Sequence, residues 1–378
     1  VQFFNPTILL VGYASFIGVM VIYLKLENPG NNLDRQTGLF NHSAFLQYAS
    51  QLYAMESRFS LISVTILPSS FQTSRAGSEE AARMEILAYF SGMTDALLFK
   101  NTDKELLLLY ESPEKAAADV ADIRGRFAER WGKDADVLVT PDLIYIPDSG
   151  IVDSVDNLLA LIKYVRRNDA ELAVNQFKQV GHVLALAMHE EKKIEQLISN
   201  AMANDQVEVF YQPIYSTGEQ RFTSAEALVR IRDDHGALVP PDKFIDIAEK
   251  SGMIAQLGEI VFDKVCRFIC ENDIRTYGLH YIEVNLSVVQ CSNERLSEDY
   301  IRIMERNGLR ADFINLEITE TASIVAKKTL LKNMRQLLDY GVRFSLDDFG
   351  TGQSNLNYIM EMPVDIVKFD KEMTNAYF

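Results

Sequence analysis

The chain has 378 residues, which is enough for two domains of ordinary size and an additional segment. Its composition, with 48% hydrophobic and 24% charged residues, excludes a disordered chain. The formal net charge is -16 and no Lys/Arg-rich run offsets it, so we expect neither DNA nor RNA as a partner.

The first predicted element is an apolar stretch, since residues 1–24 contain no charged side chain. Its most apolar part, residues 8–24, approaches the roughly 20 residues that a helix needs to cross a bilayer. A secretory signal peptide fits poorly, because no basic segment precedes the stretch and no small-residue cleavage site follows it. We predict a transmembrane helix over residues 1–26; the alternative is a buried helix of a globular domain.

A mixed α/β pattern follows over residues 27–190, after a turn-rich linker. Its periodicity predicts strands at 59–67 and 105–110, a strand pair or hairpin at 137–146, and helices at 79–90 and 113–131. Residues 155–200 are expected to be largely helical and to connect this domain to the next one, with the linker ending near residue 200.

From residue 207 onward, strand and helix patterns alternate to the end of the chain. The predicted strands are 207–214, 222–231, 281–286, 314–318, 343–347 and 364–369. The predicted helices between them are 242–249, 259–271, 298–307 and 327–340. This alternation favours parallel strands with helical crossovers, in either a doubly wound sheet or a (β/α)₈ barrel.

Acidic and polar side chains lie at the carboxyl ends of these strands. They are Glu226, Asn285, Glu317 with Glu320, Asp347 with Asp348, and Lys368 with Asp370. A single carboxylate at a strand end is usually a helix cap, but in a barrel all these ends meet at one mouth. Carboxylates that converge there repel one another unless a cation lies between them. Oxygen ligands of this kind favour Mg²⁺ or Mn²⁺ over Zn²⁺, and two such ions suit phosphodiester hydrolysis.

Two neighbouring features suit the same chemistry. Lys368 could stabilise the charge that develops on a phosphoryl group or orient the attacking water; the alternative is an ion pair with Asp365 or Asp370. The segment Asp348-Phe349-Gly350-Thr351-Gly352 contains glycines that let backbone amides approach a phosphate or let a loop hinge over the site.

The three cysteines, Cys266, Cys270 and Cys291, are an odd number without metal-ligand spacing. Such a set does not resemble a disulfide framework. We therefore predict reduced thiols in the core of a cytosolic domain.

Six ordered motifs resemble the EAL domain family. They are Tyr211-Gln212-Pro213-Ile214, Glu226-Ala227-Leu228-Val229-Arg230, Asn285-Leu286-Ser287, Leu316-Glu317-Ile318-Thr319-Glu320, Asp347-Asp348-Phe349-Gly350-Thr351-Gly352 and Lys368-Phe369-Asp370. Residues 241–252 also resemble the helix that follows the second strand in that family. The resemblance implies a TIM-like (β/α) barrel that hydrolyses cyclic di-GMP to pGpG with two Mg²⁺ or Mn²⁺ ions.

The resemblance also implies a role for each matching residue. Glu226, Asn285, Glu317 and Asp347 are similar to the ligands of one metal ion, and Asp347 with Asp348 to those of the second. Lys368 is similar to the catalytic lysine, acting with Glu226 and Asp347. Gln212, Leu228, Arg230 and Asp370 are similar to substrate contacts, and Glu320 to the residue that anchors the loop after Asp348. Arginine suits a phosphate because of its bidentate fork.

The chain departs from the family pattern at its end. Residue 378 follows the sixth predicted strand, so the strand that carries a further catalytic glutamate and the last strand of the family are not in the sequence. We therefore expect residues 201–378 to be a partial EAL domain. Open sheet edges are unfavourable, and we expect little or no hydrolysis by the chain as given.

The preceding half resembles a GGDEF domain more weakly. Residues 34–41, followed by Phe45, resemble the opening of such a domain. Residues 100–106 stand where the signature hairpin belongs but have no glycine pair, and the strand 61–67 lacks the expected metal-binding aspartate. The resemblance implies a degenerate GGDEF-like domain without diguanylate cyclase activity, serving as a spacer, dimer element or regulator.

These expectations describe a cyclic di-GMP phosphodiesterase, homodimeric and anchored in the inner membrane, with its domains in the cytoplasm. One alternative is a catalytically silent cyclic di-GMP receptor that passes a signal through the membrane segment. Another is a protein-interaction platform that binds no nucleotide; Gln212, Arg230 and the glycine-containing loop argue against it.

Overall fold

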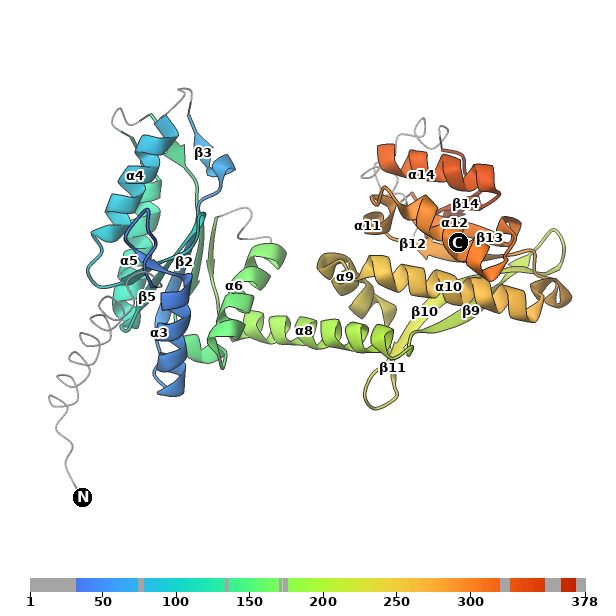
Figure 1. The fold of residues 1–378 in the computed structure, drawn as a ribbon, viewed down its shortest axis with the longest axis horizontal. Helices are drawn as coiled ribbons and strands as arrows, with labels where there is room; N and C mark the ends of the chain where they lie inside the picture. The colour runs from blue at the N-terminus through green and yellow to red at the C-terminus, as the bar shows by residue number, and fades with distance from the viewer. Residues whose placement is uncertain are drawn as a thin grey trace, which may run out of the picture. The chain divides into compact units, whose positions relative to one another are not determined.

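The computed structural model describes residues 32–73, 78–132, 136–169, 172, 176–319, 327–350 and 362–371. The chain divides into two compact units, residues 1–189 and 190–378 (Figure 1). The predicted transmembrane segment, residues 1–26, lies outside the described residues. Across the described part of the chain, no helix combines the length and apolar character needed to cross a membrane.

The first unit is built on a six-stranded mixed sheet. In spatial order its strands are β1 (Phe40–Asn41), β4 (Leu97–Thr102), β5 (Glu105–Tyr110), β2 (Ser60–Thr65), β7 (Asp142–Ile146) and β8 (Phe177–Gln179). The four central strands pair antiparallel, and β1 and β8 add to the edges in parallel. A separate antiparallel pair joins β3 (Phe71–Gln72) to β6 (Leu138–Val139).

Helices cover both faces of this sheet, because both sides of its central strands are apolar. Leu61 on β2 packs into one buried cluster, while its neighbours Ile62 and Val64 pack into another on the opposite face. The first cluster includes residues of α3 (His42–Ala54) and α6 (Val155–Asn168). The second includes residues of α4 (Ser78–Ser91) and α5 (Pro113–Phe127). The unit is therefore an α/β/α layered structure.

Several sequence predictions for this unit need correction. The segment 137–146 does contain two strands, but β6 pairs with β3 and β7 with β2, so they form no hairpin with each other. Between α6 and α8 (His182–Ala203) lies strand β8, which the helical pattern did not indicate. Strand β4 was also not predicted. These pairings join distant segments and leave little local signal.

The second unit is built on a seven-stranded sheet. Its order is β11 (Leu238–Val239), β10 (Arg221–Arg232), β12 (Tyr281–Leu286), β13 (Ile314–Thr319), β14 (Arg343–Phe349) and β15 (Ile366–Phe369), with β9 (Glu208–Ser216) also paired to β10. The ladders from β10 through β15 are parallel, as the alternation predicted. Strand β9 is antiparallel to β10, because the short turn at residues 217–220 leaves no room for a crossover.

One face of this curled sheet packs against helices. These are α9 (Pro241–Ser251), α10 (Ile254–Asn272), α11 (Val288–Cys291), α12 (Leu296–Asn307) and α14 (Lys327–Tyr340). The described residues also include the short 3₁₀ helices η1 (Pro68–Ser70) and η2 (Ser149–Ile151) in the first unit, and η3 (Ile274–Tyr277) and η4 (Ala311–Phe313) in the second. On β12, Ile282, Val284 and Leu286 are buried in the helix-covered core. Alternation along the strand places Glu283 and Asn285 on the opposite face, which is therefore polar.

The described strands of this unit form a half-barrel, a curled sheet that the described residues do not close into a ring. All three cysteines are free thiols. Cys266 and Cys291 are buried as predicted, but Cys270 is exposed, which corrects the expectation that all three lie in the core.

Candidate functional site

The polar face of the second sheet brings together side chains that are far apart in sequence. Strand pairing places Glu226 opposite Glu283 and Asn285 opposite Glu317. It also places Thr319 opposite Asp347. The polar positions thus advance along the sheet by two residues from one pair to the next, as tilted strands require in a barrel-like sheet.

A direct hydrogen bond joins two of these residues. The Nδ2 atom of Asn285 donates to Oε1 of Glu226 over 2.7 Å. Glu226 lies in the middle of β10, not at its carboxyl end as predicted, and Asn285 lies near the end of β12. The bond brings these two predicted ligands side by side.

Lys368 on β15 forms ion pairs with two buried glutamates. Its Nζ lies 2.5 Å from Oε2 of Glu283 and also contacts Oε1 of Glu317. The side chains of Glu283 and Glu317 are 2% and 0% exposed, against 24% for Lys368. An ion pair was the alternative to a catalytic role for Lys368, but the sequence pointed to Asp365 or Asp370 as its partner and not to these two.

Burial and mutual repulsion dominate the electrostatics of the paired glutamates. Desolvation raises the pKa of Glu317 to about 8; Lys368 opposes the shift, and the charges of Asp347 and Glu283 add to it. Desolvation also raises the pKa of Glu283, with a further contribution from Glu226 and Asp347. Lys368 responds in the opposite sense: desolvation alone lowers its pKa, but the two glutamates raise it above its usual value. Positive charge is therefore favoured at this point of the sheet.

Glu317 also carries an unsatisfied acceptor. Its Oε2 atom is buried and has no hydrogen-bond partner within the described residues. A buried carboxylate oxygen without a donor is costly unless a cation or water supplies the missing contact. The orphaned oxygen thus indicates a place for one more positively charged or hydrogen-bonding group.

The two consecutive aspartates lie at a break in the ladder between β14 and β15. The register shifts between Leu346 and Phe349, and Asp348 has a φ of 54°. In a regular strand, neighbouring side chains point to opposite faces, whereas a bulge re-aims them. Desolvation raises the pKa of Asp348, the charges of Asp347 and Asp370 add to the shift, and Lys368 opposes it.

Comparison with known proteins identifies this unit. The family model of the EAL domain matches residues 195–377. These residues form an EAL domain. No GGDEF domain is detected in the chain.

Curated relatives of the EAL domain include proteins named as phosphodiesterases. The chain is 32% identical over 211 residues to "Cyclic di-GMP phosphodiesterase NbdA" of Pseudomonas aeruginosa, covering 54% of this chain and 27% of that protein. It is 34% identical over 183 residues to "Probable cyclic di-GMP phosphodiesterase PdeI" of Escherichia coli, covering 48% and 23%. The chain thus spans about a quarter of the length of these relatives.

Among solved structures, the chain is similar to "PaMucR Phosphodiesterase, c-di-GMP complex", with 31% identity and a TM-score of 0.46. That match covers 49% of this chain and 75% of the other chain.

The metal ions that EAL domains generally use can be tested against the residues present. No group of three or more His, Cys, Asp or Glu side chains in the described ranges is arranged to hold a metal ion. One of the candidate ligands is the amide Asn285, and Lys368 contacts the carboxylate of another, Glu317. The oxygen donors on the polar face and the orphaned Oε2 of Glu317 nevertheless fit a hard divalent cation.

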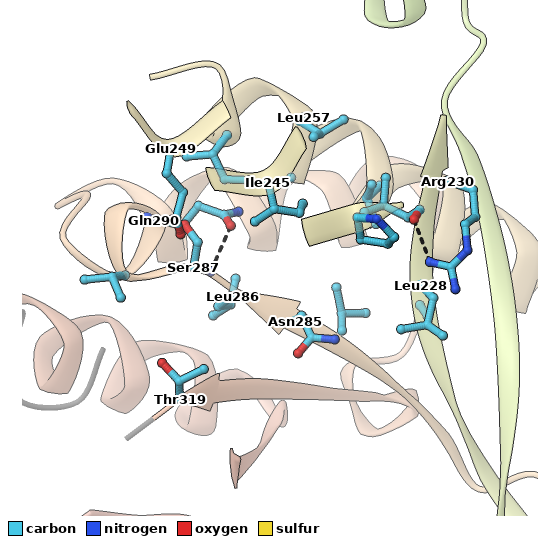
Figure 2. A pocket seen from close by; sticks show the side chains of 18 residues that line it. Leu228, Arg230, Ile245, Glu249, Leu257, Asn285, Leu286, Ser287, Gln290 and Thr319 are labelled. Carbon is cyan, nitrogen blue, oxygen red and sulfur yellow. Dashed lines mark hydrogen bonds between the residues drawn. The ribbon is translucent and has the colours of Figure 1, made fainter. Parts of the chain in front are cut away.

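The predicted substrate contacts of the EAL domain are only partly brought together. Leu228 and Arg230 line a cavity of about 400 Å³ whose wall also includes Asn285 and Thr319 (Figure 2). The opposite wall is mainly apolar and includes Ile245 and Leu257. This size and lining suit a small organic ligand.

Two other predicted contacts stand apart from this cavity. Gln212 lies on β9 opposite Glu226 and is exposed. The backbone N–H of Asp370 donates to the carbonyl of Phe349 over 3.2 Å, which continues the β14–β15 pairing beyond the bulge. Glu320, predicted to anchor the loop after Asp348, lies outside the described residues, as do Thr351 and Gly352 of that loop.

Glu283 is the buried site residue that sequence reasoning missed. Its signal was present in the pattern Tyr281-Ile282-Glu283-Val284-Asn285, where an acidic residue precedes Asn285 by two positions and so shares its face. The prediction considered only the carboxyl ends of strands, whereas Glu283 lies in the middle of β12.

Proposed function

We propose that the EAL domain hydrolyses cyclic di-GMP to pGpG by two-metal-ion catalysis. The proposal is supported by the polar face of the sheet, where Asn285 is hydrogen-bonded to Glu226 and Lys368 forms an ion pair with Glu317. A phosphodiester is anionic, so a site lined with carboxylates can accept it only when cations screen those charges.

In this proposal Glu226, Asn285, Glu317 and Asp347 hold one Mg²⁺ or Mn²⁺ ion, and Asp347 with Asp348 hold the second. When bound, the ions supply an activated water and neutralise charge on the phosphodiester. The buried Glu317 and the bulge at Asp348 support this division, because the bulge releases Asp348 from the alternation of β14.

Lys368 then has a role that metal ligands cannot fill. Its raised pKa keeps the ammonium charged at neutral pH. A fixed positive charge on the polar face can orient the attacking water and stabilise negative charge that develops on the phosphoryl oxygens. The nearby glutamates hold the ammonium in place, so little reorganisation is needed during the reaction.

The cavity of Figure 2 is proposed to receive one end of the substrate. Arg230 lies on its wall, and the Nη1 atom of Arg230 donates to the carbonyl of Val229 over 2.8 Å. The remaining guanidinium donors can bind a phosphate oxygen. The apolar lining of the cavity, which includes Leu228, can receive a base.

The test is turnover of cyclic di-GMP by the purified full-length protein. With Mn²⁺, separation of the products by chromatography should show pGpG, and E226A should abolish its formation. E305A is the matched control, because Glu305 is an exposed glutamate on α12 of the same unit. Tight binding of cyclic di-GMP without turnover at saturating Mn²⁺ would reject the hydrolase proposal in favour of a receptor.

We further propose that the first unit is a degenerate GGDEF-like domain without cyclase activity. The nearly buried acidic group near the turn between β4 and β5 is engaged in an ion pair, since Glu105 contacts Arg166 over 2.8 Å. Carboxylates committed in this way are poor ligands for a nucleotide-bound metal. Formation of cyclic di-GMP from GTP by the purified protein would overturn the proposal.

Residues 1–26 are proposed as a membrane anchor that keeps both units on the cytoplasmic side of the inner membrane, in a homodimer. The supporting observation is the apolar sequence of that segment. Deleting residues 1–26 should move the protein from the membrane fraction to the supernatant, and sedimentation of the released protein should give the mass of a dimer.

A further inference from the structure

Lys368 reaches across the sheet to make its ion pairs. It lies on β15, whereas Glu317 lies on β13 and Glu283 on β12, so one intervening strand separates it from the first glutamate and two from the second. Only a strongly curled sheet brings these three strands within the reach of one lysine. The ammonium is therefore shared between two carboxylates that are both almost fully buried.

The two glutamates differ in what else they can do. Glu317 lies opposite Asn285, and its Oε2 atom has no hydrogen-bond partner within the described residues. Glu283 lies two residues farther from the mouth than Asn285 and opposite Glu226. Glu317 is thus placed to bind a cation, and Glu283 is placed to bind the ammonium of Lys368.

We propose that Glu283 is a positioning residue that holds the Lys368 ammonium and so leaves Glu317 available to a divalent cation. The inference rests on the proposed function only in taking Glu317 as a metal ligand. A lysine paired with Glu317 alone neutralises that carboxylate and competes directly with the cation for its oxygens. A second carboxylate on the far side of the ammonium weakens this competition, and it also fixes the ammonium relative to the polar face.

The pairing also explains a carboxylate that the fold itself does not require. The buried neighbours of Glu283 on β12 face the apolar core, and Glu283 faces the half-barrel interior at 2% exposure. A charge buried to this extent is tolerated when it is paired, and Lys368 supplies that pair.

The test is Mn²⁺ binding to the full chain without substrate, measured by electron paramagnetic resonance. E283Q removes the charge but keeps the shape of the side chain. It should weaken Mn²⁺ binding about tenfold, a change of about 1.4 kcal/mol. In a K368M background, where no ammonium competes, E283Q should change the affinity less than about twofold, so the two substitutions are strongly coupled. E305Q on the exposed face of α12 is the control and should leave the affinity unchanged.

Three results would overturn the inference. An equal loss of affinity in both backgrounds would mean that Glu283 acts on the cation directly. Unchanged affinity in E283Q would mean that the lysine does not compete. If E283Q fails to fold, E283D takes its place, because it keeps the negative charge but moves it one methylene farther from the Lys368 ammonium. E283D should weaken Mn²⁺ binding by less than tenfold, and in the K368M background it should have no effect on the affinity. An undiminished factor in K368M would again reject the proposal.

This readout is separate from the proposed activity. Wild-type protein that binds Mn²⁺ but does not hydrolyse cyclic di-GMP would remove the proposed function and leave the Glu283 inference standing. If wild-type protein hydrolyses cyclic di-GMP while E283Q binds Mn²⁺ normally, the proposed function stands and the Glu283 inference is rejected.

Discussion

Asn285 donates a hydrogen bond to Glu226 across two strands whose residues lie 59 positions apart in sequence. The amide supplies a donor to a carboxylate that would otherwise face other acids on the same side of the sheet. The same amide can present its oxygen to a cation by rotating about its last side-chain bond. One side chain thus serves the architecture of the site and its proposed chemistry.

Replacing this amide by a carboxylate should separate those two roles. In N285D, the donor to Glu226 becomes a second negative charge, so repulsion should lower the melting temperature in EDTA by about 2–4 °C, which corresponds to about 1 kcal/mol. Mn²⁺ should then raise the melting temperature more than it does in wild type, because the new oxygen remains a ligand. N285A, which lacks both the donor and the ligand, should show a smaller Mn²⁺ effect than wild type. Equal Mn²⁺ effects in all three proteins would contradict the assignment of Asn285 as a ligand.

Lys368 should be needed for turnover and not for binding. K368M is expected to slow pGpG formation by at least about 10²-fold, since it removes a preorganised positive charge. Mn²⁺ binding should persist, because the substitution also frees Glu317. K264M is the matched control: Lys264 lies on α10, and its ammonium pairs with Asp205 over 2.5 Å. Loss of Mn²⁺ binding in K368M, measured by calorimetry, would argue against this division of roles.

The pair Asp34–Lys100 should make the first unit sensitive to acid. Burial by itself disfavours the charged carboxylate, but hydrogen bonds from Thr37 and the Lys100 ammonium lower the pKa of Asp34 to about 2. Because this folded-state pKa lies below the unfolded value near 4, the contribution is complete above about pH 4 and lost as the pH falls toward 2. D34N should therefore lower the free energy of unfolding by about 1–2 kcal/mol at pH 7 and by much less at pH 2.

A neighbouring aspartate supplies the control for this prediction. Asp103 contacts the same ammonium over 3.0 Å, but its side chain is 90% exposed. Water screens such a contact, so D103N should change stability by less than about 0.5 kcal/mol at either pH. Urea denaturation of the three proteins at pH 7 and pH 2 would test both statements; an equal effect of D34N at the two pH values would be inconsistent with them.

Gly258 on α10 allows Gln290 to cap the short helix after β12. A methyl group at Gly258 would overlap the Gln290 side-chain amide, which accepts from the Ser287 N–H over 3.1 Å and donates to the Tyr300 hydroxyl over 3.1 Å. G258A should therefore destabilise the second unit by about 1–3 kcal/mol, as expected for overpacking, even though alanine favours helices.

A second helical glycine serves as the comparison. Gly125 on α5 has open space around its position, so G125A should stabilise the first unit by about 0.5–1 kcal/mol. Hydrogen exchange, which reports the two units separately, would measure both effects. A stabilised G258A would show that the Gln290 side chain can move aside at little cost.

Much of the fold followed from local pattern. Strand β5, strand β12 and helix α14 have the predicted bounds. Each has a pattern that neighbouring residues show directly: a continuous apolar run in β5, a period of two in β12 and a period of 3.6 in α14. The residues proposed for the site followed from the same source: a polar side chain at the carboxyl end of a parallel strand is recognisable without knowledge of its neighbours.

The sequence by itself thus determined the alternation of strands and helices in the second unit and the oxygen-bearing side chains that we propose as metal ligands. Only the tertiary structure decided which distant segments contact one another. It pairs β6 with β3, places a bulge at Asp348, and brings Lys368 into ion pairs with Glu283 and Glu317. The physical reason is that periodicity is a property of neighbouring residues. A contact between β15 and β12, in contrast, depends on how far the whole sheet curls, and no local segment encodes that curvature.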